Sequence, residues 1–307
     1  YQRGLSSGAS ARLVVEYARM LLESGDRAGA AAQLAALERM EPATLATQML
    51  RGDLQIARQD FAAALTVFNQ AAKDHPRRVE PLLGTATALA LQGRKQEAQT
   101  AVDSAAALKA SDGRVIAMQV QLAAETGNWA KVRDVLQPVE GTLAPTSVEN
   151  LTYAEALLRL GQAEQARSRF ARAHLAAPGN PYARLMLAAA LLETGDAAGA
   201  LAKVRPLADS VLAGERELSL AEAAGQASGA TALAQGYQAR LGDTGLKARQ
   251  AVAAAADSAF ARGDWAKAVA AYRQLPGHDR DPEVLRRLAL ACAHGGQTAA
   301  AIGYADQ

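Results

Sequence analysis

The sequence of 307 residues lacks several features on which many enzymes and membrane proteins depend. Cys292 is the only cysteine, so the chain by itself forms neither a disulfide framework nor a thiolate metal site. No stretch approaches the roughly eighteen consecutive apolar residues of a membrane-spanning helix, so we expect none. Aromatic residues make up 4% of the chain, although 50% of the residues are apolar and many of these are alanine. Because alanine favours helices and lets them approach closely, we predict an all-α protein.

Recognisable patterns of catalytic, metal-binding or nucleotide-binding residues are also missing. The glycines match neither the dinucleotide-binding nor the phosphate-loop spacing. Cys292 and His294 are two residues apart on a predicted helix and therefore lie on different faces. None of the histidines is paired with carboxylates in a metal-site spacing: His75, His174, His278 and His294. We therefore predict no catalytic residue, no metal and no cofactor, and we predict that the chain is not an enzyme.

The charge of the chain does not indicate a nucleic-acid partner. The net charge is +2 and the basic residues are scattered along the sequence. The densest local group is Arg167, Arg169 and Arg172, which we interpret as a solvated helix face. Nucleic-acid binding usually requires a clustered basic face with aromatic residues or a known motif, so we exclude it.

The most informative feature of the sequence is a repeat of 34 residues. Gly25 and Gly161 lie 136 positions apart, which is four times 34, and the residues that follow them match in type. With Gly25 as position 15, six repeats follow one another without a gap. They span residues 11–44, 45–78, 79–112, 113–146, 147–180 and 181–214. We predict that residues 1–214 form one array that begins with the tail of a preceding repeat.

Five positions of the repeat have a physical explanation as parts of two helices joined by a turn. A small residue at positions 8 and 20 lets the two helices approach, and a large apolar residue at position 24 fills the gap between pairs. Glycine at position 15 tolerates the left-handed backbone after a helix end. Proline near position 32 ends the second helix. Examples at positions 8, 15, 20, 24 and 32 of the fifth repeat are Ala154, Gly161, Ala166, Phe170 and Pro178.

The last third of the chain follows the same frame less evenly. Residues 215–248 keep the length but place Gly225 and Gly236 inside the expected helices, so we predict a degenerate repeat and a possible hinge. The pattern returns in 249–281 and in a partial repeat at 282–307, so the predicted array continues over 249–307. Because the frame is cut within a repeat at both ends, we expect the sequence to be a segment of a longer protein.

This pattern resembles the tetratricopeptide repeat family over essentially the whole chain. The resemblance implies a right-handed α-solenoid whose first helices line a concave groove, chiefly with positions 2, 5, 9 and 12. It implies that a partner protein or peptide contacts the following residues: Arg12, Val15, Arg19, Met49, Asp53, Leu83, Thr87, Gln121, Leu151, Glu155, Tyr182 and Leu185. The same positions also place Glu80, Arg114, Arg216 and Asp257 there. The lysine and asparagine pair with which some co-chaperones of this family hold a terminal carboxylate is absent from positions 5 and 9.

The resemblance favours a non-catalytic scaffold for protein–protein interaction. Abundant alanine, and arginine in excess of lysine, are typical of a GC-rich bacterial genome. Long arrays of this kind occur in exopolysaccharide export, pilus and secretion assemblies, which favours the bacterial periplasm over the cytoplasm. One alternative is a targeting arm of a larger enzyme, such as a glycosyltransferase or a signalling kinase, whose catalytic domain lies outside this segment. Self-association of the array is a second alternative.

Overall fold

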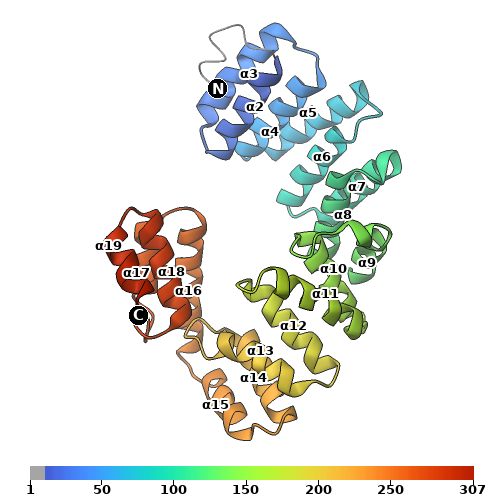
Figure 1. Cartoon of the computed structure of the whole chain (residues 1–307). Helices are drawn as coiled ribbons and strands as arrows, with labels where there is room; N and C mark the ends of the chain where they lie inside the picture. The colour runs from blue at the N-terminus through green and yellow to red at the C-terminus, as the bar shows by residue number, and fades with distance from the viewer. Residues whose placement is uncertain (1–10) are drawn as a thin grey trace. The chain divides into compact units, whose positions relative to one another are not determined.

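The computed structural model describes residues 11–307, which form eighteen α-helices and one short 3₁₀ helix and contain no β-strand (Figure 1). The predicted α-solenoid of helix pairs is therefore confirmed. The predicted tail at residues 1–10 lies outside the described residues. Contacts divide the chain into two compact units, residues 1–142 and 143–307, which we call the N-terminal unit and the C-terminal unit. Within residues 11–307, no helix is long and apolar enough to cross a membrane.

The N-terminal unit contains four helix pairs in the predicted frame. Its last pair is shortened, because Pro138 follows α9 and the chain continues as the 3₁₀ helix. The pairs are α2 (Ala11–Glu23) with α3 (Arg27–Met40), α4 (Leu45–Ala57) with α5 (Phe61–Asp74), α6 (Glu80–Leu91) with α7 (Lys95–Lys109), and α8 (Gly113–Glu125) with α9 (Trp129–Leu136), followed by η1 (Gln137–Thr142).

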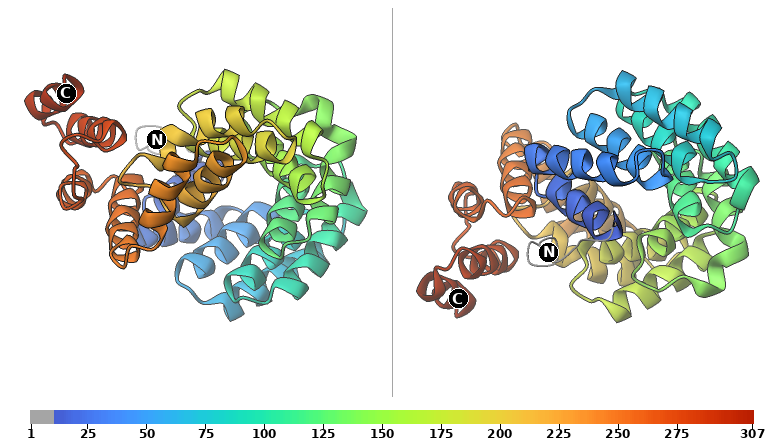
Figure 2. Two further views of the ribbon diagram at one scale, coloured as in Figure 1. Left: turned by 90° about the horizontal axis from the view of Figure 1, so that it is seen from below. Right: turned by 90° about the horizontal axis from the view of Figure 1, so that it is seen from above.

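The C-terminal unit contains five helix pairs, which complete the series. The first three pairs stack on one another in the views of Figure 2, where α11 packs along α12 and α13 packs along α14. The pairs are α10 (Val148–Arg159) with α11 (Ala163–Ala176), α12 (Pro181–Glu193) with α13 (Ala197–Ala208), α14 (Glu215–Ala227) with α15 (Thr231–Leu241), α16 (Leu246–Ala261) with α17 (Trp265–Tyr272), and α18 (Pro282–His294) with α19 (Thr298–Ala305).

The turn between the two helices of a pair has a left-handed residue at position 15, as predicted. Gly25, Gly161 and Gly195 have φ angles of 83°, 76° and 85°. Gln59 occupies the same position in repeat 45–78 and, with φ of 64°, is the only non-glycine residue with a positive φ among the described residues. Because a side chain strains this conformation, Gln59 shows that the turn geometry belongs to the repeat and not to glycine alone.

The core lies between successive helix pairs, as Phe68 on α5 illustrates. Its side chain is fully buried. A Cβ atom on Gly52 of α4 would lie 2.2 Å from the Phe68 ring, and one on Gly84 of α6 would lie 2.7 Å from it. The aromatic ring therefore fills the space that glycine leaves in its own repeat and in the next one.

The predicted degenerate repeat at 215–248 forms a helix pair in the usual register. Gly225 lies within α14, where an added Cβ would come within 3.2 Å of the Ala234 Cβ on α15, so its small size allows the helices to approach. The following boundary is unusual, because α15 and α16 make at most marginal contact, whereas α13 packs along α14. The hinge itself stays a prediction.

Candidate partner-binding surface

The first helices of the first three pairs in each unit contact one another. In the N-terminal unit α2 contacts α4 and α4 contacts α6, and in the C-terminal unit α10 contacts α12 and α12 contacts α14. Over residues 11–307, second helices make no comparable contacts with each other. The first helices therefore lie on the inner side of each stack. We call the exposed part of these helices the first-helix surface of a unit.

The predicted apolar contact residues at position 5 are almost fully buried. Their side chains pack between helices and leave little surface for a partner. The exposed fractions are 6% for Val15, 9% for Met49, 9% for Leu83, 9% for Leu151 and 5% for Leu185. Their partner-binding role stays a prediction, but their burial identifies them first as residues that hold the stack together.

Position 9 carries the polar side chains of the first-helix surface in the N-terminal unit. Arg19 and Gln121 are exposed, whereas Asp53 and Thr87 are half-buried. The hydroxyl of Thr87 donates to the carbonyl oxygen of Leu83 at 2.9 Å, so its donor is used within its own helix. The Gln121 amide donates to Glu125 at 3.0 Å. Arg19 and Asp53 are therefore the charged groups that this surface offers at position 9.

Asp53 differs electrostatically from an ordinary surface carboxylate. Burial raises its pKa from 3.8 to about 6, and the positive charge of Arg19 only partly offsets this increase. Desolvation disfavours the charged form when no hydrogen-bond donor replaces water. A carboxyl group in this environment gains from a partner that supplies a donor or a positive charge.

A group of ion pairs lies at position 2 in the same unit. Glu80 accepts a short hydrogen bond from Arg78 at 2.7 Å and lies 3.4 Å from the guanidinium of Arg114, which is on the next first helix. The Arg78 hydrogen bond lowers the pKa of Glu80 to about 2. Arg114 is held in turn by Asp112 at 3.0 Å. Arg12, at position 2 of the first repeat, is exposed.

In the C-terminal unit, three consecutive first helices contribute to one polar network. The Tyr182 hydroxyl on α12 donates to Glu155 on α10 at 2.5 Å, which brings two of the predicted contact residues together. Glu155 also accepts from Arg159 at 3.3 Å, and Arg216 on α14 lies 4.0 Å from it. Burial and the adjacent Glu155 raise the pKa of Tyr182, which keeps its hydroxyl protonated. Sequence reasoning did not single out Arg159, although its spacing of four residues from Glu155 is a recognisable signal.

The interpretation of Arg167, Arg169 and Arg172 as a solvated helix face was wrong for one of the three. Arg169 is only 9% exposed, its guanidinium lies 4.4 Å from the centre of the Tyr153 ring, and it donates to Asn150 at 3.0 Å. Arginine combines an apolar stem with a planar head that stacks on aromatic rings, so it can be buried between helices. A basic residue beside Phe170 in the sequence was the available signal.

A further network occupies the last two helix pairs. Asp257 on α16 accepts from the Tyr272 hydroxyl at 2.5 Å and from Arg287 on α18. Arg287 also donates to Glu283 at 3.0 Å. Asp257 was predicted at a groove position, and its side chain is in fact used to join α16, α17 and α18. Across residues 11–307, no three histidine, cysteine or acidic side chains are grouped as a metal site would require.

Comparison with known protein families assigns the fold. Models described as tetratricopeptide repeat match residues 17–69, 49–113 and 253–307, and a related one matches 157–209. Together the matches cover more than half of the chain. The chain belongs to the tetratricopeptide repeat family. Members of this family are built from the helix pairs that the 34-residue frame predicts.

Solved tetratricopeptide repeat structures resemble the chain in fold. A tetratricopeptide repeat protein from Parabacteroides merdae is 16% identical, with a TM-score of 0.50 over 79% of this chain and 98% of that chain. YrrB, described as having an unusual peptide-binding site, is 13% identical, with a TM-score of 0.51 over 67% and 97%. PilW, described as a type IV pilus biogenesis factor, is 15% identical, with a TM-score of 0.53 over 68% and 97%. No curated protein sequence matches the chain.

Proposed function

We propose that the chain is a non-catalytic scaffold that binds a partner protein or peptide along its first-helix surfaces. Family membership supports a scaffold, and the likeness to YrrB supports peptide binding within this fold. The observation that carries the proposal is the network in which Tyr182, Glu155 and Arg216 come from three consecutive first helices. It fixes the orientation of polar groups before a partner arrives, which reduces the entropy lost on binding.

The chemistry of the surface indicates how a partner would be recognised. The apolar residues at position 5 are buried, so affinity comes mainly from polar side chains at positions 2 and 9. Arg19 and Asp53 at position 9 in the N-terminal unit, and Arg216 at position 2 in the C-terminal unit, offer charges of both signs, and Arg159 adds a charge that is paired with Glu155. A peptide with both acidic and basic side chains complements such a surface, and its main chain satisfies the remaining donors.

We also propose that the scaffold serves a bacterial envelope assembly, in pilus biogenesis, exopolysaccharide export or secretion, and works in the periplasm. The likeness in fold to a pilus biogenesis factor supports this placement. The alanine-rich, arginine-rich composition supports a bacterial source. Identification of the bound partner tests this part of the proposal directly.

Site-specific photo-crosslinking tests the binding surface. We would place benzoylphenylalanine at Gln121 or Arg216 on first helices, or at Arg172, an exposed residue of the second helix α11. Each protein would be irradiated in a lysate and an envelope extract of a bacterium that carries the gene. We expect crosslinks at Gln121 and Arg216 to one set of partners, and none of these partners at Arg172.

A variant with an altered first-helix surface tests whether the crosslinks depend on that surface. Tyr182→Ala combined with Arg19→Glu should abolish the specific crosslinks while circular dichroism shows unchanged helix content. Crosslinks of equal yield from Arg172, or full retention in the variant, would place binding on another surface and reject the proposal.

A further inference from the structure

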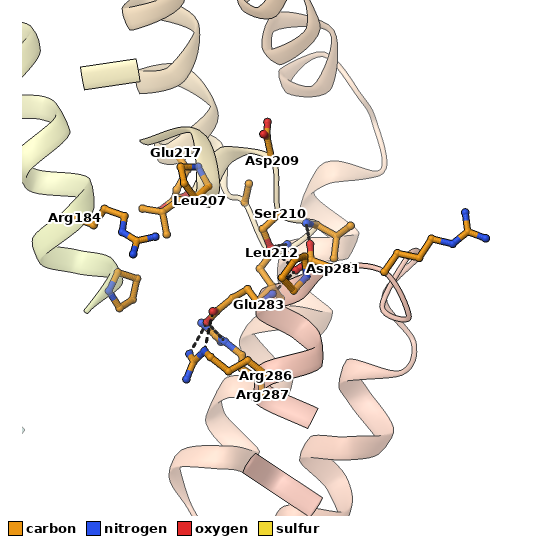
Figure 3. Close-up of a pocket in the computed structure, with 17 residues that line it drawn as sticks. Arg184, Leu207, Asp209, Ser210, Leu212, Glu217, Asp281, Glu283, Arg286 and Arg287 are labelled. Carbon is orange, nitrogen blue, oxygen red and sulfur yellow. Dashed lines mark hydrogen bonds and ion pairs between the residues drawn. The ribbon is translucent and has the colours of Figure 1, made fainter. Parts of the chain in front are cut away.

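The C-terminal unit contains a cavity whose lining includes none of the residues of the network around Tyr182 and Glu155. Its volume is about 750 Å³. It is lined by the start of α12, the end of α13, residues 209–213 and the start of α18 (Figure 3). The α13 and α18 walls belong to repeats separated by two intervening helix pairs, so the cavity is not a feature of the regular stack.

A hydrogen-bonded contact, which we call the Asp281 contact, holds these walls together. Asp281 is 7% exposed and caps α18 by accepting from the backbone N–H groups of Glu283 and Val284. The same carboxylate accepts from the Ser210 hydroxyl at 3.2 Å and from the Val211 N–H at 2.6 Å. Because one buried carboxylate bonds to both α18 and the segment after α13, the cavity walls have a defined position.

Much of the wall is apolar. Pro206 and Leu207 near the end of α13, Leu212 in the following segment, and Pro181 and Pro282 at the starts of α12 and α18 carry no polar side-chain atoms. Several of these surfaces are rigid proline rings, which lose no rotamer freedom on contact with a ligand. This part of the cavity fits an apolar side chain.

The acidic side chains that line the cavity already have partners within the protein. Asp209 accepts from the Tyr237 hydroxyl at 2.7 Å, and Glu217 accepts from the Gly214 N–H at 2.9 Å. Glu283 accepts from Arg286 at 2.7 Å and also from Arg287. Asp281 is used in the Asp281 contact. Each acidic side chain of the cavity therefore already has a hydrogen-bond or ion-pair partner within the protein.

Arg184 on α12 lacks such a match. Its guanidinium donates to the carbonyl oxygen of Pro178 at 2.9 Å, and among the described residues no carboxylate is paired with it. In Figure 3 its side chain extends from α12 toward the α18 side of the cavity. Arginine carries five donors arranged to bind a carboxylate in two places, so most of its capacity is unused. One wall of the cavity therefore carries uncompensated positive charge beside apolar surface.

We propose that this cavity binds a peptide segment of a partner protein through one carboxylate and one adjacent apolar side chain. The carboxylate pairs with Arg184, and the apolar side chain contacts the proline and leucine residues. The positive charge of Arg184 selects an acidic segment over a neutral one. None of the residues that line this site belongs to the network around Tyr182 and Glu155, so binding at this site can be tested separately from the proposed function.

Small probes test the chemistry directly. We would titrate the chain with the amide of N-acetyl-leucyl-aspartate, with N-acetyl-leucine, and with the amide of N-acetyl-leucyl-asparagine as the neutral control. The arginine Nε–Hε signals in NMR spectra report binding. We expect the first two probes to bind with dissociation constants of about 1 mM and to shift the Arg184 signal. The probe that binds more tightly shows whether the natural peptide presents a side-chain carboxylate or a terminal carboxylate to Arg184.

Paired variants make the result specific. Arg184→Gln should weaken the acidic probes about tenfold, because it removes a charge-assisted hydrogen bond. Arg172→Gln removes the same charge from an exposed position outside the cavity and should leave binding unchanged. Equal binding of the aspartate and asparagine probes, equal binding by Arg184→Gln, or no binding up to about 20 mM would each overturn the proposal.

Discussion

Repeats 45–78 and 147–180 carry the same large side chain in the core but differ at positions 8, 9 and 15, among others. Phe68 and Phe170 are both fully buried at position 24. Position 8 is Gly52 in one repeat and Ala154 in the other, and position 15 is Gln59 in one and Gly161 in the other. The repeat therefore specifies the shape of a helix pair, while the way each position is filled depends on its neighbours.

The third difference is the carboxylate at position 9. Glu155 receives a hydrogen bond from Tyr182, which is at position 2 of the next repeat. The corresponding residue after Asp53 is Glu80, an ionised acid that has no proton to donate. No donor from the next repeat replaces the water that Asp53 loses on burial, so burial raises the pKa of Asp53. Whether a polar groove position is satisfied is decided by the adjacent repeat.

The largest effect is expected where repeat 45–78 has no room for a side chain. Gly52→Ala would give repeat 45–78 the alanine that repeat 147–180 already has, but its Cβ would lie 2.2 Å from the Phe68 ring. We expect a loss of about 3 kcal/mol in the free energy of unfolding, measured by urea denaturation. Phe68→Leu in the same background should recover part of this loss. An unchanged stability of Gly52→Ala would show that the ring moves freely.

The carboxylates give an effect of intermediate size that depends on pH. The pKa of Asp53 is raised from 3.8 to about 6, so the stability that its protonated form contributes is present below pH 4 and is lost as the pH rises through 6. Asp53→Asn should therefore stabilise the protein by about 1 to 2 kcal/mol at pH 7.5, with no gain near pH 4. Unfolding curves at both pH values measure the difference.

The control for this prediction is Glu155→Gln in the other repeat. This substitution replaces the carboxylate that accepts hydrogen bonds from Tyr182 and Arg159 with a neutral amide. The weaker hydrogen bonds should destabilise the protein at pH 7.5. Stabilisation by Glu155→Gln would show that the two groove carboxylates are alike, contrary to the comparison.

The turns give the smallest expected effect. Gln59→Gly should stabilise the protein by about 1 kcal/mol, because φ is 64° at this position and glycine adopts it without strain. Gly161→Gln exchanges the residues in the opposite direction and should cost about the same amount. Thermal unfolding of the two variants, which should shift in opposite directions, measures both. Shifts of the same sign would mean that the two turns are not equivalent.

The local features of the fold could be predicted from the sequence, and the long-range ones could not. Gly161 and Ala154 follow from the geometry of one helix pair, and that geometry recurs with the repeat. The burial of Arg169 depends on Tyr153 and Asn150 in the preceding helix, so composition alone indicated a solvated residue. The Asp281 contact joins parts of the chain 71 residues apart, and no periodic pattern indicates it.

The candidate surface shows the same limit. The positions that face the groove were predictable from the family resemblance, and Glu155 and Tyr182 do meet. The burial of Leu83 and its equivalents at position 5, and the lack of a donor near Asp53, result from how consecutive repeats fit together. These properties belong to pairs of repeats and cannot be assigned to one repeat in isolation.

The Asp281 contact also has a mechanical consequence. A solenoid in which each repeat touches only its neighbours extends under tension one repeat at a time, like a spring. The bond between Ser210 and Asp281 closes a loop of 71 residues, and a pulling force passes through this bond instead of through the helices inside the loop. When the bond breaks, the force passes through α14 to α17, which lie inside the loop, and only their unfolding releases the full extended length of about 240 Å, since an extended chain spans about 3.4 Å per residue. The buried carboxylate of Asp281 thus shields these four helices from tension until its bond breaks.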